Sequence, residues 1–475
     1  MASAAYPPGP EVEALRARLA HPIIDGDGHL IESVPLLFEY VGKVGGEALA
    51  KRFGAMLGQK TPFTRGDAAR GEPRAAWWGT PSRALDIASV TAPGLLAKRL
   101  DELGVDFAVL YPSLGLAITT LPDEELRRGV SRALNTMNAE ICAEHASRLT
   151  PSAVLPMGSP AEAVDELSYA VRELRLKAAA IPPVVARPLE AFPEAFPAAC
   201  ALDRFAVDSA YDYDPVWQAF VDLGVAVTSH GAVAMHYMPD GRRSPSNYVF
   251  NHIGGHAYQQ SELAKSLIMG GVPLRFPSLR FGFLECGVGW APDLLHSLEE
   301  HWEKRAGKAI EAYDPRKIDH GELKDLLTRH GFAPQAPLGG AGDTSIGPWV
   351  RDEFADSAIT RKEQLRDMFA HQFFFGCEAD DISIYRAFHG RGNPFGIQMQ
   401  AFFSSDIGHW DVPDMRSVVL ESRKLFDRGL LGDEDYRAFA FENPARLHLT
   451  MNARFFEGTS VDEATKPLLE QGTRG

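Results

Sequence analysis

Short apolar segments that alternate with helical patterns are the feature of this chain that most restricts its fold. Eight such segments lie at residues 23–24, 107–111, 153–156, 178–181, 225–228, 279–284, 373–376 and 400–403. Most are separated by helical patterns, such as residues 93–103, which end at Gly104 in the manner of a helix C-cap. Strands joined by helices run parallel, and eight such units close into an α/β (β/α)₈ TIM-type barrel. An open doubly wound sheet is the alternative, but the sequence has no glycine-rich phosphate-binding motif to support it.

Two long stretches interrupt this alternation. One covers residues 33–91, after the first strand, and the other covers about 306–360, between the sixth and seventh strands. A structureless loop of that length is improbable inside a compact domain, so we expect each to be an insertion. The predicted organisation is an N-terminal extension (1–21), one barrel (22–455) with both insertions, and a C-terminal tail (456–475).

The composition of the chain excludes several classes of binding partner. The net charge of −15 argues against nucleic acid or an anionic membrane surface as a partner. The four cysteines form no CxxC pair, so neither a disulfide framework nor a cysteine zinc site is indicated. Residues 1–10 lack the pattern of a signal peptide, and no apolar run approaches the length of a membrane span. We therefore expect a cytoplasmic protein that acts on a small-molecule substrate.

The first strand runs directly into acids and a histidine spaced by glycines. Ile24 is followed by Asp25, Asp27 and His29 at alternate positions. Side chains alternate faces along a strand, so these three are expected on one face, where Asp27 and His29 could bind one divalent ion. An Asx-rich turn is the plainer interpretation of the same residues.

Strong polar groups also follow later strands. His230 follows the fifth strand, Glu285 the sixth and Asp406 the eighth. Active sites of such barrels lie at the carboxyl ends of the strands, so these side chains should meet Asp27 and His29 there. Imidazole and carboxylate ligands suit zinc, manganese or iron. We predict that Glu285 is a metal ligand or an acid–base group, and pairing with an arginine is the alternative.

Several motifs in this order resemble the aminocarboxymuconate-semialdehyde decarboxylase-like branch of the amidohydrolase superfamily. They are residues 102–112 (ELGVDFAVLYP), 270–272 (GGV), 275–279 (RFPSL), Ser405-Asp406 with His409, and 442–446 (ENPAR), and the likeness runs from about residue 22 to 455. The resemblance implies a divalent metal held by Asp27, His29, His230 and Asp406. It also implies that Asp406 takes a proton from metal-bound water.

The same resemblance suggests substrate-binding residues. In decarboxylating members, arginines of the insertion help to hold the substrate, and Arg65, Arg70 and Arg74 are candidates here, with a solvated charged loop as the alternative. Trp78 and Trp290 are candidates for the wall of an apolar pocket, although aromatic residues near strand ends serve equally well in a core.

The sequence also departs from the family pattern. Glu285 stands where the family has a catalytic histidine, and Asp27 stands where it has the first histidine or glutamate of a ligand pair. His252 and His256 lie between strands five and six, and either ligation or local hydrogen bonding would account for them. Extra acids and imidazoles are what a second metal ion with a bridging carboxylate would need. We expect His409 to orient Asp406.

We therefore expect a metal-dependent hydrolase or decarboxylase that acts on a small organic acid or an aromatic or ring-cleavage product. One alternative is a dinuclear non-haem iron or manganese oxygenase, because similar departures resemble barrels of the aminoisobutyrate-hydroxylase kind. Another is a catalytically degenerate structural or regulatory subunit. Barrels of this family commonly pair through outer helices, so a homodimer or a larger homo-oligomer is expected.

Overall fold

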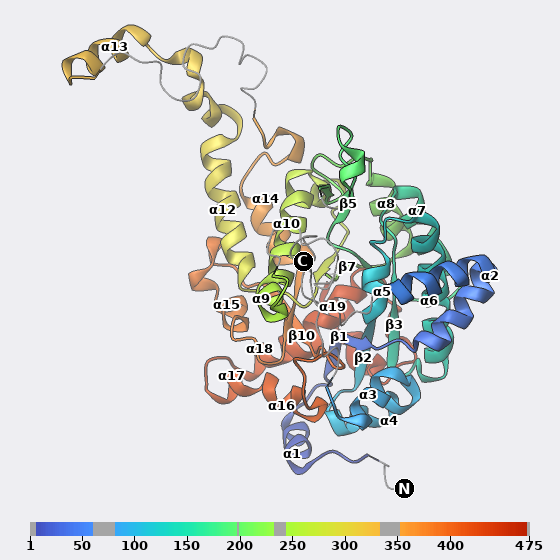
Figure 1. The fold of residues 1–475 in the computed structure, drawn as a ribbon. Coiled ribbons are helices and arrows are strands. Elements are labelled where there is room, and N and C mark those ends of the chain that lie inside the picture. The colour runs from blue at the N-terminus through green and yellow to red at the C-terminus, as the bar shows by residue number, and fades with distance from the viewer. Residues whose placement is uncertain (1–5, 60–80, 197–198, 232–243, 333–351, 473–475) are drawn as a thin grey trace.

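Parallel strands form the centre of the molecule (Figure 1). The computed structural model describes residues 6–59, 81–196, 199–231, 244–332 and 352–472. Its eight-stranded sheet follows the order β1 (Ile24–Leu30), β2 (Phe107–Pro112), β3 (Leu149–Val154), β4 (Ala178–Ile181), β7 (Val227–Ser229), β8 (Phe281–Phe283), β9 (Phe373–Glu378) and β10 (Gln400–Ser404). Every neighbouring pair in this sheet is parallel, as the alternation with helices predicted.

The first and last strands meet and close the barrel. The backbone N–H of Asp406 donates to the carbonyl of Asp27 over 3.0 Å, and the N–H of Ser405 donates to the Asp25 carboxylate over 2.9 Å. The predicted (β/α)₈ barrel is confirmed.

Helices surround the barrel. Those of the first half are α1 (Pro10–Arg18), α2 (Val34–Gln59), α3 (Ala84–Thr91), α4 (Pro93–Leu103), α5 (Ser113–Ile118), α6 (Glu124–Cys142), α7 (Pro160–Arg172) and α8 (Asp214–Leu223). Those of the second half are α9 (Tyr248–His252), α10 (Gly255–Met269), α11 (Val272–Arg275), α12 (Trp290–Arg305), α13 (His320–Arg329), α14 (Glu363–Asp367), α15 (Ile384–Phe388), α16 (Val418–Ser422), α17 (Lys424–Asp427), α18 (Asp433–Arg437), α19 (Asn443–Leu449) and α20 (Asp462–Gly472). No described helix is long and apolar enough to cross a membrane.

Neighbouring residues of β9 and β10 enter two different cores. Phe374 and Phe402 belong to the cluster inside the barrel, whereas Phe375 and Phe403 belong to the larger cluster between the strands and the helices. This division follows from the two-residue period of a strand, and it leaves the polar strand ends as one opening of the barrel.

Both insertions contain helices where the structure describes them. The first insertion contributes α2, which is interrupted at Gly46 (φ +77°), and α3. Within the second, short 3₁₀ turns follow α12 and lead to α13, which projects away from the barrel (Figure 1). α13 has no buried residue, and the expected oligomer stays a prediction.

The residues assigned to a C-terminal tail are packed rather than loose. Phe456, Val461 and Leu468, the last of these on α20, are buried in the same cluster as the barrel interior. Together with Leu447 of α19 they add apolar contacts to that cluster. The end of the described chain is therefore part of the barrel core.

His448 of α19 gives this core a dependence on pH. Its ring is 2% exposed and stacks on Phe455, and burial lowers its pKa to about 3. Unfolding restores an ordinary pKa near 6.5, so below that pH the unfolded chain binds the extra proton and stability falls as pH falls. We expect a loss of about 2 kcal/mol between pH 7.5 and pH 5 that is absent in His448→Leu, measured by urea unfolding. An equal pH dependence in both proteins would contradict this expectation, and His296→Leu, on the exposed face of α12, is the matched control.

Candidate metal centre

Strand β1 contains a β-bulge at its two acidic residues, Asp25 and Asp27, and the two have different contacts. The register against β2 shifts between Asp25 and Gly28. Asp25 accepts hydrogen bonds from the N–H and the hydroxyl of Ser405, at 2.9 and 2.5 Å, and so links β1 to the end of β10. A Cβ at position 26 would lie 2.6 Å from the Phe402 ring, which explains the glycine there. Asp25 therefore serves as a structural link between β1 and the end of β10, while Asp27 and His29 remain the candidate ligands of β1.

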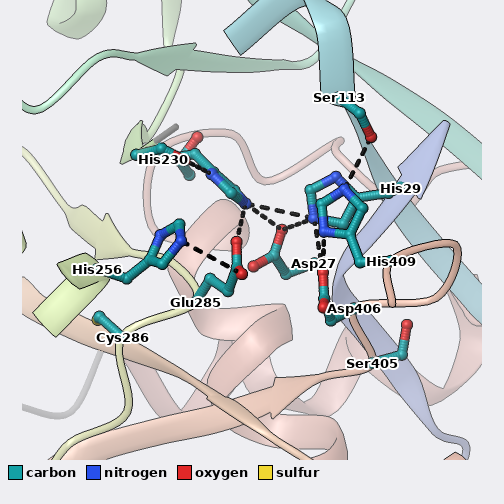
Figure 2. A network of polar contacts seen from close by, with 12 residues as sticks. Asp27, His29, Ser113, His230, His256, Glu285, Cys286, Ser405, Asp406 and His409 are labelled. Atoms are coloured by element: carbon teal, nitrogen blue, oxygen red, sulfur yellow. Dashed lines mark hydrogen bonds and ion pairs between the residues drawn. The ribbon is translucent and has the colours of Figure 1, made fainter. Parts of the chain in front are cut away.

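The predicted side chains from four strand ends converge in one buried cluster (Figure 2). The Nε2 atom of His29 lies 3.2 Å from Asp406 Oδ1, 3.3 Å from His230 Nε2 and 3.8 Å from Asp27 Oδ1. His230 Nε2 lies 3.8 Å from the same Asp27 oxygen and 3.2 Å from Glu285 Oε2. All five residues are at most 6% exposed.

The orientation of His230 is set by its backbone. Its Nδ1 lies 2.8 Å from the carbonyl oxygen of Gly231, which can only accept, so Nδ1 carries the proton. In the neutral ring Nε2 then has a free lone pair, and that lone pair faces His29 Nε2 and the carboxylates. A backbone carbonyl that fixes the tautomer in this way is typical of a metal-binding histidine.

His409 holds Asp406 from the other side. Its Nδ1 lies 2.6 Å from Asp406 Oδ1, its Nε2 lies 2.9 Å from the hydroxyl of Ser113, and its ring stacks on His29 at 3.8 Å between centroids. Burial lowers the pKa of His409, but the charge of Asp406 outweighs burial and the net shift is upward. These contacts allow His409 to position Asp406, and ligand atoms of His409, His29, Glu285 and Asp406 also lie within 4.8 Å of one another, close enough to hold a metal ion.

Two of the acids sit on a strained backbone. Glu285 has φ +49° and Asp406 has φ +50°, in the left-handed region that residues other than glycine rarely adopt. Each follows the end of its strand, β8 or β10, where this conformation turns the chain out of the sheet. Strain of about 1–3 kcal/mol at such positions is commonly retained where a side chain must be aimed at a functional site.

The pKa values of the cluster are shifted by burial and by the charges of its own members. Burial, then the charge of Asp406, raises the pKa of both Asp27 and Glu285 well above the usual range. Burial lowers the pKa of His29 to about 4 and that of His230 well below its usual value. For Asp406, burial favours the neutral form, but His409 and His29 outweigh it and hold its pKa well below normal. A bound cation would favour ionised carboxylates and neutral imidazoles together.

The unsatisfied oxygens of the cluster fit a divalent metal. Within the described residues, neither carboxylate oxygen of Asp27 accepts a hydrogen bond, although both atoms are buried, and Asp406 Oδ1 faces the imidazole nitrogens of His29 and His409. Ligands held about 2.1 Å from one metal ion lie about 3–4 Å from one another, which matches the separations of 3.2–3.8 Å here. Asp27, His29, His230 and Asp406 would hold the ion, and Glu285 Oε2 faces the same point.

The other predicted site residues differ in how close they come to this cluster. His252 and His256 border it at Glu285, with their Nε2 atoms 3.9 and 3.5 Å from Glu285 Oε1, and ligand atoms of His256, His230 and Glu285 lie within 4.8 Å of one another. Trp290 is not brought to the cluster, because its ring packs against Phe283 and Phe375 in the layer outside the barrel. Its predicted role in substrate binding gains no support from this packing. Arg65, Arg70, Arg74 and Trp78 lie outside the described residues.

Sequence reasoning missed two acids of the centre. Glu378 ends β9, and burial followed by the charge of Asp406 raises its pKa to about 8. Asp411 follows β10, and burial followed by Asp406 raises its pKa to about 11. The strand-end rule that found Glu285 would also have found Glu378. Asp411 lies in an irregular segment, and no periodic signal marks it.

The fold and this cluster define a (β/α)₈-barrel protein with a buried centre for a divalent cation at the carboxyl ends of its strands. Residues 90–323 match the family model described as Amidohydrolase. Residues 90–323 therefore belong to a domain of the amidohydrolase family, as the sequence motifs indicated.

Comparisons with individual proteins agree with this assignment. Gamma-resorcylate decarboxylase from Rhodococcus jostii is 31% identical over 113 residues, which are 24% of this chain and 32% of that relative. The chain thus matches about a third of the curated relative's length. Among solved structures, a manganese-bound 5-carboxyvanillate decarboxylase from Novosphingobium aromaticivorans superimposes with a TM-score of 0.50 at 13% identity, over 94% of this chain and 99% of that chain. An amidohydrolase from Mycobacterium avium subsp. paratuberculosis gives 0.50 at 14% identity, over 90% and 99%. These structures agree in fold.

Proposed function

We propose that this protein is a metal-dependent carboxy-lyase that removes carbon dioxide from a small hydroxylated aromatic acid. The observation that carries the proposal is the buried convergence of Asp27, His29, His230 and Asp406, whose ligand atoms meet around His29 Nε2 at separations of 3.2–3.8 Å. The choice of decarboxylation is supported by the relative named gamma-resorcylate decarboxylase.

The residues around the ion can move the proton that this reaction needs. Decarboxylation breaks the bond between the ring carbon and the carboxylate, and the electron pair left on carbon must receive a proton. His409, whose pKa is raised, lies 2.6 Å from Asp406 Oδ1 and can protonate it. Asp406 can then deliver that proton to the ring carbon. A bound divalent cation supplies Lewis-acid polarisation of the substrate oxygens, with manganese, iron and zinc all compatible with the ligands.

Hydrolysis is the second candidate, and one observation favours it. The charges and hydrogen bonds of His409 and His29 outweigh burial and hold the pKa of Asp406 well below its usual range, so that its carboxylate is ionised. An ionised carboxylate beside a metal position can take a proton from water and so produce the nucleophile of a hydrolase. The comparisons lend no support to the oxygenase alternative, which is not carried into the proposal.

The test is the product of the reaction. Protein reconstituted with manganese, zinc or iron is incubated with hydroxylated benzoates, including gamma-resorcylate, and separately with amides and lactones. We expect carbon dioxide in a one-to-one ratio to the acid consumed, and one deuterium at the vacated ring carbon when the reaction is run in D₂O. Hydrolysis of an amide or lactone without release of carbon dioxide would select the second candidate. Absence of turnover in both panels with metal bound would favour the degenerate-subunit alternative.

A further inference from the structure

We propose a second cation site in this barrel, formed by His252, His256, Asp411 and the outer oxygen of Glu285, which takes a divalent transition metal. The proposal rests on the proposed function only in that Glu285 borders the first ion as well. Which reaction the centre catalyses does not enter the argument.

The two carboxylate oxygens of Glu285 face different histidines, Oε2 facing His230 and Oε1 facing His256 (Figure 2). Its Oε2 atom lies 3.2 Å from His230 Nε2, on the side of the first centre. Its Oε1 atom lies 3.5 Å from His256 Nε2 and 3.9 Å from His252 Nε2. A carboxylate with one oxygen toward each group has the arrangement of a bridging ligand between two ions.

A turn between two helices brings the two histidines together. His252 ends α9 and His256 lies in the first turn of α10, and Gly254 between them has φ +73°, which glycine adopts without strain. Their rings are 5.3 Å apart between centroids, and both Nε2 atoms face Glu285. Trp410 packs against His252 at 5.2 Å and limits the positions of its ring.

Asp411 supplies a further oxygen donor. One of its carboxylate oxygens lies within 4.8 Å of ligand atoms of both His252 and Glu285. Its buried Oδ1 has no hydrogen-bond partner among the described residues. A buried carboxylate oxygen without a partner is costly, and a cation beside it would remove that cost.

Hydrogen bonding alone does not account for this group. The separations of 3.5 and 3.9 Å between the imidazole nitrogens and Glu285 Oε1 are too long for good hydrogen bonds. They suit ligands of one ion, which lie about 3–4 Å apart. In the described part of the chain, no lysine or arginine forms an ion pair with Glu285 or Asp411, so a side-chain cation does not fill this role. Two imidazoles with two carboxylates favour manganese, iron or zinc over calcium or magnesium.

Metal stoichiometry tests the proposal without reference to activity. The full-length protein is stripped with chelator, titrated with Mn²⁺ and followed by elemental analysis and electron paramagnetic resonance. We expect two ions per chain in the wild type, with the six-line signal of an isolated ion replaced by a spin-coupled signal as the second ion binds. His252→Ala and His256→Ala should each bind one ion and keep the six-line signal. His296→Ala, on the exposed face of α12, is the matched control and should bind two.

Each outcome decides the question. One ion per chain in the wild type, unchanged in both variants, would overturn the second site even if decarboxylation is observed. Two ions in the wild type and one in the variants would support it even if no substrate is turned over. Should a histidine variant fail to melt cooperatively, anomalous diffraction at the manganese edge from wild-type crystals replaces it, and a single peak beside Glu285 would refute the proposal.

Discussion

Replacement of Asp406 by asparagine should lower turnover by about 10²–10⁴-fold while the barrel stays folded. The carboxylate is fully buried, has φ +50°, and lies 3.2 Å from His29 Nε2 and 2.6 Å from His409 Nδ1. Asparagine keeps the shape of the side chain but can neither carry the proton between His409 and the substrate nor contribute a negative charge to the ion. Turnover under saturating Mn²⁺ and metal content are the two measurements.

The control separates a chemical role from a structural one. Asp293→Asn removes an exposed carboxylate of α12 and should leave turnover unchanged. The Asp406→Asn protein should also lose the alkaline limb of the pH–rate profile if His409 supplies the proton through Asp406. An Asp406→Asn protein with wild-type turnover would exclude catalysis at this centre.

The second large effect is expected for His230→Ala. His230 places a lone pair between Asp27 and Glu285, and its tautomer is fixed by the carbonyl of Gly231. Removal of this ligand should weaken binding of the first ion by more than about 100-fold, since loss of groups that only orient a ligand already costs about 10–100-fold. Isothermal titration with Mn²⁺ measures the change, and activity should fall in parallel at limiting metal.

Rescue gives this prediction a sharp control. The alanine variant leaves a space the size of an imidazole ring beside buried carboxylates, so free imidazole added to the buffer should restore metal binding in part. The same addition should not restore Asp406→Asn. If His230→Ala binds Mn²⁺ as tightly as the wild type, His230 is not a ligand and the assigned centre is wrong.

Local patterns were sufficient to predict the barrel. Apolar segments such as residues 373–376 carry their strand tendency in their own composition, and the helices between them carry theirs in periodicity and in caps such as Gly104 (φ +80°). Strand composition, helix periodicity and helix caps all depend on residues that are close together in the chain. Strand–helix alternation then restricts the topology to parallel arrangements, which is why the barrel and its polar rim could be predicted together.

The sequence by itself therefore determined the fold class and the residues at the strand ends, including Asp27, His29, His230, Glu285 and Asp406. Only the tertiary structure decided their relations. In the folded chain Asp25 accepts a hydrogen bond from Ser405, and Glu285 lies between His230 and His256. Asp411, from an irregular segment, lies close to Glu285. The physical reason is that these contacts join residues up to 380 positions apart, so they exist only once the barrel closes and burial forces unpaired charges to find partners.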